Sequence, residues 1–309
     1  MLISSLLLIA AIVVLYFGAE FSLDASEKVG KKLGLSPLMV GMLLVGFGTS
    51  LPEFFVGHIA GIQGKAGIAI GSLVGSNIAN MCLVLGICGF ITPMHLSHKS
   101  LRDQLILHFI LGLVLWFVLG QDQLTVITSA PLVLLCGVYL YVLFLDMKKD
   151  RHLHVDASED FNPGHVFIKL MAGFGMLYLG GELLVKSGTD ICAELGISEY
   201  IVSAIFIAFG TSFPELVTAV VAALKKKETD MIIGNIVGSN LFNCAFIMGS
   251  LGIYNFDINQ SFHFEIGTLV LGALGLLLLS LFKRNFYKKS GVVFLAGYAA
   301  AVAFWLGLF

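Results

Sequence analysis

The sequence predicts an all-α polytopic membrane protein, with ten transmembrane helices arranged as two inverted repeats of five. Of its 309 residues, 58% are hydrophobic and only 12% are charged, and the mean hydropathy is +0.95. A soluble domain carries roughly a quarter charged residues, so this inventory cannot cover a surface that faces water. The apolar runs are also long enough to cross a hydrocarbon core, which takes about 20 helical residues.

Ten apolar segments are expected to span the membrane. They lie at about 2–21, 38–60, 66–90, 103–120, 124–146, 165–186, 199–223, 230–253, 263–282 and 291–308. Alternating strand patterns are absent, so helices rather than a barrel are expected to satisfy the backbone in lipid. The first segment has no basic region before it and no small-residue cleavage site, which favours a membrane span over a cleaved signal peptide.

The basic residues indicate the orientation. All but two of the 18 lysines and arginines follow the first, third, fifth, seventh and ninth segments or begin the sixth, and only Lys65 and Lys186 fall on the other side. The positive-inside rule then makes these five regions cytoplasmic and both termini external. We expect the protein in the cell (cytoplasmic) membrane, since no targeting extension is visible.

Two sequence blocks recur in the two halves of the chain. The block FGTSLPE at 47–53 returns as FGTSFPE at 209–215, 162 residues later. The block VGSNIAN at 74–80 returns as VGSNLFN at 237–243, 163 residues later. The chain therefore contains an internal repeat.

The repeat divides the chain into a first repeat (1–147), a polar cytoplasmic linker (148–164) and a second repeat (165–309). Each repeat contains five expected spans, an odd number, so the two copies must lie in opposite orientations across the bilayer. Inverted repeats with a site at their interface are a recurring transporter architecture.

Glu53 and Glu215 lie well inside the second and seventh spans. An ionisable residue at that depth is costly unless it faces the bundle interior and has a partner. A single such residue could serve helix packing alone. Two at equivalent places in a repeat favour ligands for an ion.

Hydroxyl groups accompany each glutamate. Thr49 and Ser50 stand four and three residues before Glu53, hence on its face of the helix. Thr211 and Ser212 stand in the same places before the second glutamate. A proline kink repaired by Ser or Thr is common in membrane helices, and it would explain the hydroxyls but not the carboxylates.

Proline also frees carbonyl groups for a ligand. Pro52 and Pro214 each remove a backbone donor and push off the carbonyl one turn back. Carbonyls from Gly46 to Thr49 and from Ala208 to Thr211 are therefore candidate ligands. The result is a hard, all-oxygen environment that suits sodium or calcium rather than a soft transition metal.

The third and eighth spans add a second polar face. Ser76 and Asn80 share one helix face at a spacing of four, and so do Ser239 and Asn243. Small-xxx-small glycine pairs run beside them, which permits close helix approach and is by itself mainly a packing signal. These glycines are Gly71, Gly75, Gly234 and Gly238.

The blocks Gly-Thr-Ser-x-Pro-Glu and Gly-Ser-Asn-x-x-Asn resemble the α-repeats of the calcium/cation antiporter superfamily, particularly prokaryotic sodium/calcium exchangers. The resemblance extends over all ten expected spans. It implies alternating access between sodium-loaded and calcium-loaded states, with the first and sixth spans sliding past the other helices.

The resemblance also implies a role for each matched residue. Glu53 and Glu215 would be carboxylates shared by both ions, with Asn80 and Asn243 completing the centre. Carbonyl ligands to calcium would come from Thr49 and Thr211. Flanking sodium sites would use Ser50, Ser76, Ser212 and Ser239.

One position departs from part of the superfamily. Some relatives, including potassium-dependent members, carry aspartate where this chain has Asn243. Two carboxylates with a charge of −2 match one calcium or two sodium ions. A third acid would be needed to keep a three-sodium state neutral or to hold potassium too, so potassium dependence is not expected.

We therefore expect a secondary antiporter that exchanges Na+ for Ca2+ at a midplane site. A proton/calcium antiporter of the same architecture is the alternative, because buried glutamates can also bind protons. The duplicated hydroxyls favour sodium. Glu20 and Glu182 form a second symmetric pair, which we interpret as interfacial carboxylates or as residues at the mouths of the ion pathway. We interpret His108 as a packing residue whose hydrogen bonds are satisfied.

Other function classes find little support. Metalloprotease, nucleophile-elbow and Walker motifs are absent, so no enzyme is expected. The five cysteines sit in apolar runs without zinc spacing. Neither an organic cofactor nor a nucleic-acid partner is expected; the partners are the transported Ca2+ and Na+ and the lipid bilayer. A monomer would suffice, because the chain closes its own site, whereas channels are usually assembled from subunits around an axis.

Overall fold

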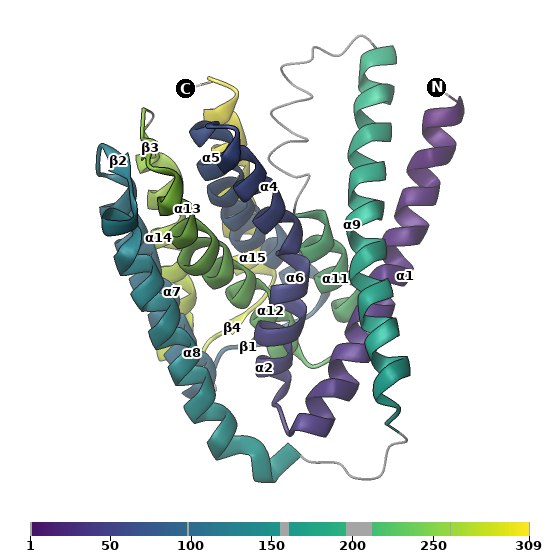
Figure 1. The fold of residues 1–309 in the computed structure, drawn as a ribbon. Helices are drawn as coiled ribbons and strands as arrows, with labels where there is room; N and C mark the ends of the chain where they lie inside the picture. Colours follow the sequence, from purple (N-terminus) through teal and green to yellow (C-terminus); the bar gives the residue numbers. More distant parts are fainter. Residues whose placement is uncertain (1, 98, 155–160, 196–211, 260, 309) are drawn as a thin grey trace.

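The computed structural model describes residues 2–97, 99–154, 161–195, 212–259 and 261–308 as a bundle of long helices (Figure 1). Within these residues, seven helical stretches are long and apolar enough to cross a membrane, or eight if one bent pair is a single span. Four of the seven are single helices or lie within one: Leu2–Leu33 (α1), Lys99–Leu119 (α7), Val126–Lys148 (in α8, Val126–His154) and Pro163–Ile191 (in α9, Pro163–Glu194). A fifth is His263–Leu281 (α14). The stretch Ala66–Ile91 is composed of α5 (Ala66–Ile78), η2 (Ala79–Val84) and α6 (Leu85–Ile91), and Thr229–Tyr254 of α12 (Thr229–Leu241), η3 (Phe242–Met248), α13 (Gly249–Leu251) and η4 (Gly252–Tyr254). A helical, multi-pass fold is thereby confirmed.

The other three expected spans appear in altered form. The second is the bent pair, in which Pro37–Thr49 (α2, η1 and α3) meets Leu51–Ile62 (α4) at 42°. Of the seventh, only α11 (Phe213–Leu224) is described, because residues 199–211 lie outside the described ranges. The tenth is α15 (Lys288–Trp305), whose two leading lysines shorten its apolar part. Ten spans in two inverted repeats stay a prediction.

Two short antiparallel strand pairs join loops that are distant in the sequence. Strand β1 (Met94–His95) pairs with β4 (Asn285–Phe286), and β2 (Gln123–Leu124) pairs with β3 (Phe256–Asp257). The pairing of β1 with β4 joins two loops that the positive-inside rule assigns to the cytoplasmic side. The pairing of β2 with β3 joins two loops that it assigns to the external side. Both chain ends lie at the end of the bundle that carries β2 and β3 (Figure 1). The pairings thus agree with the predicted grouping of the loops.

The central helices are those that carry the repeated Gly-Ser-Asn block. Within an apolar stretch of 18 residues in each span, 78% of the residues are buried in Ala66–Ile91 and 89% in Thr229–Tyr254, against 28% in α1 and 22% in α9. Each central helix changes from α-helix to a π-helical turn at the end of the block, at η2 (Ala79–Val84) and η3 (Phe242–Met248). Such turns have an extra residue and are often found at functional sites.

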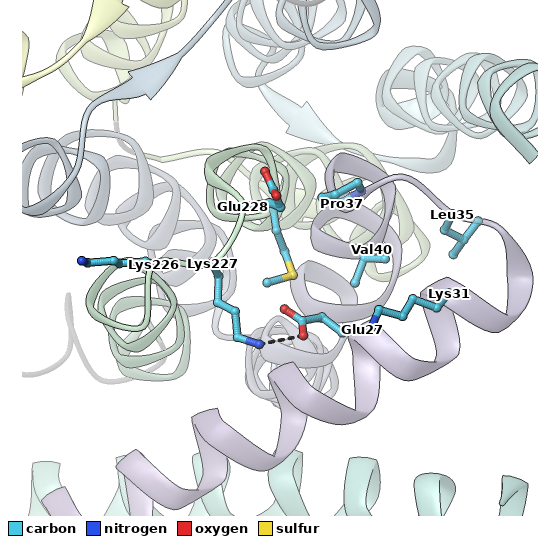
Figure 2. A pocket seen from close by; sticks show the side chains of 9 residues that line it. Glu27, Lys31, Leu35, Pro37, Val40, Lys226, Lys227 and Glu228 are labelled. Atoms are coloured by element: carbon cyan, nitrogen blue, oxygen red, sulfur yellow. Dashed lines mark hydrogen bonds and ion pairs between the residues drawn. The ribbon is translucent and has the colours of Figure 1, made fainter. Parts of the chain in front are cut away.

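Ion pairs join α1 to the turn between α11 and α12. Lys227 Nζ lies 2.7 Å from Glu27 Oε2, across a pocket of about 300 Å3 (Figure 2). In this view Lys226 points away from Glu27. Both partners of the pair are about a quarter exposed, so the pair contributes little stability by itself.

The symmetric pair Glu20 and Glu182 has different surroundings in the two halves. Glu20 forms an ion pair with Lys225 at 2.5 Å, and this hydrogen bond raises the pKa of the Lys225 ammonium. Glu182 accepts a hydrogen bond of 2.8 Å from the hydroxyl of Tyr178, one turn earlier on α9. Glu20 therefore anchors α1 to the end of α11.

Glycines on α12 allow it to contact the α2–η1 segment backbone to backbone. A Cβ atom on Gly238 would lie 2.6 Å from the Cα atom of Met42, and one on Gly234 would collide with the carbonyl oxygen of Leu38. For Gly71 and Gly75, no described atom lies within 4 Å of such a Cβ. The predicted close approach of helices is therefore confirmed at Gly234 and Gly238, and at Gly71 and Gly75 it stays a prediction.

Replacing Gly238 by alanine should destabilise the protein by about 1–3 kcal/mol, because the added methyl group overpacks a backbone contact. Thermal unfolding in detergent measures this loss. Gly137→Ala on α8 is the matched control, since a Cβ there meets nothing within 4 Å. Equal unfolding temperatures for the two variants would contradict the close contact.

Candidate ion-binding site

Each glutamate of the repeated block lies in the first turn of a helix that starts inside the bundle. Ser50 separates α3 from α4 with φ −85° and ψ 4°, and Ser212 precedes α11 with φ −88° and ψ 1°. Proline is the second residue of both helices, where its missing N–H costs nothing. Glu53 and Glu215 follow as the third residues, where the positive helix N-terminus stabilises a carboxylate.

Serine hydroxyls donate buried hydrogen bonds to both glutamates. Ser76 Oγ donates to Glu53 Oε1 at 2.9 Å, and Ser212 Oγ donates to Ser76 Oγ at 2.9 Å. Ser50 Oγ, next to α4, donates to Glu215 Oε1 on α11 at 3.4 Å. Both glutamates have no exposed surface. Residues from the two halves of the sequence therefore form one buried polar cluster.

The two asparagines of the π-helical turns have unused amide atoms, and one of them, Asn243, is hydrogen-bonded to this cluster. Asn243 Nδ2 donates to Ser76 Oγ at 3.4 Å, while its Oδ1 has no partner among the described residues. Neither Oδ1 nor Nδ2 of Asn80 has one either, and both residues are fully buried. Leaving a buried amide oxygen unpaired is costly, so both oxygens are available to a cation.

A second group of polar atoms surrounds the end of α3. Thr49 Oγ1 lies 3.4 Å from Ser239 Oγ, and the Ser239 hydroxyl donates to the carbonyl oxygen of Gly46 at 3.1 Å. The Gly46 carbonyl also accepts the Ser50 N–H at 3.2 Å. This carbonyl, proposed from the sequence as a free ligand, is therefore already bonded. Pro52 instead deprives the carbonyl of Gly48, which lies within the predicted range Gly46 to Thr49, of its usual helical donor.

Asn235 is a further polar residue of this group that the sequence analysis missed. Its Oδ1 accepts from Thr49 Oγ1 at 3.4 Å, and its side chain is 2% exposed. The spacing of four before Ser239 was the available signal, because it puts both residues on one face of α12. Comparison of the two repeats did not reveal Asn235, because the matched residue of the first half is a serine, Ser72. Thr211 and Ala208 lie outside the described residues.

The electrostatics of the site require a positive ligand. Glu53 and Glu215 are close enough to repel each other. In the described part of the chain no cluster of three or more His, Cys, Asp or Glu residues is placed to hold a metal ion, and the hydroxyls of Ser76 and Ser50 donate to Glu53 and Glu215. Two carboxylates surrounded by neutral oxygen ligands can hold a hard cation such as sodium or calcium.

The chain is similar in sequence to known membrane proteins. A family model described as sodium/calcium exchanger protein matches twice, at residues 3–145 and 165–307. The uncharacterized membrane protein MJ0091 of Methanocaldococcus jannaschii is 30% identical over 296 residues, covering 94% of both chains. The sodium/calcium exchanger MaX1 of Methanosarcina acetivorans is 29% identical over 343 residues, covering 96% of this chain and 97% of MaX1.

The fold is also similar to solved structures. The sodium-calcium exchanger NCX_Mj, soaked with 2.5 mM Na+ and 0.1 mM Ca2+, superposes with a TM-score of 0.84 at 26% identity, and the match covers 98% of both chains. Each half of the family match contains one copy of both repeated blocks.

Replacing Ser76 by alanine should weaken Ca2+ binding roughly 10-fold, because Ser76 donates to the Glu53 carboxylate and a hydrogen bond to a charged group is worth more than a neutral one. Isothermal titration calorimetry measures the affinity. Ser72→Ala, one turn earlier on α5, removes a bond to the carbonyl of Ala69 and, among the described residues, no bond to the two glutamates, so it should leave binding unchanged. Equal affinities for the two variants would place Ser76 outside the site.

Proposed function

The chain belongs to the sodium/calcium exchanger protein family, and on that premise we propose that it is a secondary active antiporter that exchanges Na+ for Ca2+ by alternating access. The ions are its substrates. The observation that carries the proposal is the pair of fully buried glutamates, one from each half of the chain, each of which accepts a hydrogen bond from a serine hydroxyl. A structural role alone would not require two like charges at the centre of a membrane bundle.

In this proposal Glu53 and Glu215 bind both ions in turn, and the amide oxygens of Asn80 and Asn243 complete the centre. The remaining ligands are hydroxyls and carbonyls on either side of the carboxylates. They are Ser50, Ser76, Ser212 and Ser239 for sodium, and the carbonyls of Thr49 and Thr211 for calcium, with Gly46 and Ala208 as further carbonyl candidates. Gly46 could bind an ion only after releasing the Ser239 hydroxyl.

We further propose that the ten spans form two inverted repeats, 1–147 and 165–309, joined by the linker 148–164. The two matches to the family model and the π-helical turns after both Gly-Ser-Asn blocks support this division. We place the protein in the cell membrane with both termini external. The location of both termini at the end opposite the linker supports that orientation (Figure 1).

The charge of the site supports a limited ion load. Two carboxylates are neutralised by one Ca2+ or by two Na+, and a third Na+ would leave a positive excess in a medium of low dielectric constant. Proton/calcium exchange is the second candidate. It is favoured by one observation, that Glu215 Oε2 is buried without a hydrogen-bond partner among the described residues and could take a proton. The serine hydroxyls, which a proton does not require, favour sodium.

In sealed vesicles with a clamped pH, an outward sodium gradient should drive calcium uptake by the wild-type protein. Glu53→Gln and Glu215→Gln should each abolish uptake while the protein still folds, because an amide removes half of the charge that binds the cation. Glu265→Gln is the matched control, a buried glutamate on α14 that accepts from Trp305 Nε1 at 3.0 Å outside the site. It should retain transport.

Two results would count against this function. Calcium uptake that follows a pH gradient and ignores sodium would replace it with proton exchange. Retained exchange in both glutamine variants would remove the assignment of Glu53 and Glu215.

Asn243→Asp should change the cation preference, because it places a third carboxylate beside Ser76 and raises the charge of the site to −3. Competition of Na+, K+ and protons against calcium binding measures the preference. Selectivity equal to that of the wild type would show that residue 243 does not face the transported ions.

A further inference from the structure

A small buried cavity lies beside the ion-binding site but is lined by other residues. Its polar lining residues are Asn77 on α5, Asn240 on α12 and His108 on α7. The remaining lining consists of Cys244, leucines of α7 and α14, and one glycine of α7. Its volume of about 10 Å3 is room for the centre of one water molecule. All of its lining residues are buried.

Three polar atoms at this cavity lack partners. Asn77 Nδ2 donates to the carbonyl of Leu73 at 2.6 Å, and Asn240 Nδ2 donates to the carbonyl of Asn77 at 3.3 Å. The Oδ1 atoms of both asparagines and Nδ1 of His108 have no hydrogen-bond partner among the described residues. Their side chains are 1%, 1% and 5% exposed. Unpaired atoms at such depth carry the full cost of desolvation.

The two asparagines occupy equivalent places in the repeated Gly-Ser-Asn block, and the proposed function assigns them no role. Each follows directly a serine of the ion-binding cluster, Ser76 or Ser239, and residues adjacent on a helix point about 100° apart. The serine and the asparagine of each block thus serve two different places. The recurrence of asparagine in both copies is explained if both side chains bind one shared ligand.

We propose that this cavity binds a single water molecule. The water donates hydrogen bonds to Oδ1 of Asn77 and of Asn240 and accepts one from the N–H of His108 at Nδ1. It thereby ties α5, α12 and α7 together beside the ion-binding cluster. A buried water with three polar partners is a regular part of protein structure, and it satisfies every unpaired atom of this cavity.

The lining residues favour water over a sodium ion. Among the described residues no carboxylate lines the cavity, and the titratable groups of its lining are the His108 imidazole and the Cys244 thiol. A cation without a counter-charge is expensive inside a membrane. Three neutral ligands also fall short of the oxygen shell that a hard cation takes from its site.

A structure at a resolution that shows ordered water tests the proposal, determined once in sodium buffer and once in buffer free of sodium and calcium. Both maps should contain one peak within about 2.7–3.2 Å of Asn77 Oδ1, Asn240 Oδ1 and His108 Nδ1. An empty cavity would overturn the proposal. So would a peak that appears only with sodium, which would identify a cation.

Variants of His108 give a second test. His108→Leu should lose the water peak and weaken calcium binding roughly 2- to 10-fold, the range of one lost hydrogen bond. His108→Gln should keep both, because its amide can replace the imidazole N–H. Gln104→Leu is the control, since Gln104 lies one turn earlier on α7, is fully buried and does not line the cavity. A water peak retained in His108→Leu would overturn the assignment of His108.

The two tests separate this inference from the proposed function. The water peak is expected in the wild-type protein whether or not sodium drives calcium transport. Loss of exchange activity with the peak present would contradict only the proposed function.

Discussion

The main constraint on the structure is the repulsion between two carboxylates that are buried close together. Glu53 and Glu215 are fully buried and accept hydrogen bonds from the hydroxyls of Ser76 and Ser50, and the bundle around them excludes water. Each buried charge costs several kcal/mol even after relaxation of its surroundings. The site is therefore stable only with bound cations or protons. In the proposed function, this dependence lets two different ions compete for one place, as exchange requires.

The fold meets the requirement by interrupting its helices at the centre. The break at Ser50 puts the C-terminal end of α3 and the N-terminal end of α4 at the same depth. Carbonyl groups of the first can face a cation, while the second supports the carboxylate of Glu53. The π-helical turns on α5–η2 and α12–η3 then add the amides of Asn80 and Asn243. Close backbone contact at Gly238 holds these central elements together.

Much of this arrangement could be predicted from the sequence. The offset between the repeated blocks identified both glutamates and their serines, because a helix puts residues three and four apart on one face. The bonds across helices could not be predicted, such as Ser50 to Glu215 and Ser212 to Ser76, because face periodicity does not say which faces meet. Comparison of the two copies also did not reveal Asn235, because the first half has a serine at the matched position. The unpaired atom of His108 depends on three helices at once, and no local pattern shows it.

The most direct measurement is the location of a bound divalent cation in a structure of the protein soaked with Sr2+, whose anomalous scattering distinguishes it from water. The account predicts one strong peak between the carboxylates of Glu53 and Glu215, within coordination distance of both and of an amide oxygen from the π-helical turns. It also predicts that the peak fades as sodium is added. A peak bound by only one of the two glutamates, or a site that stays empty at saturating Sr2+, would contradict the central claim.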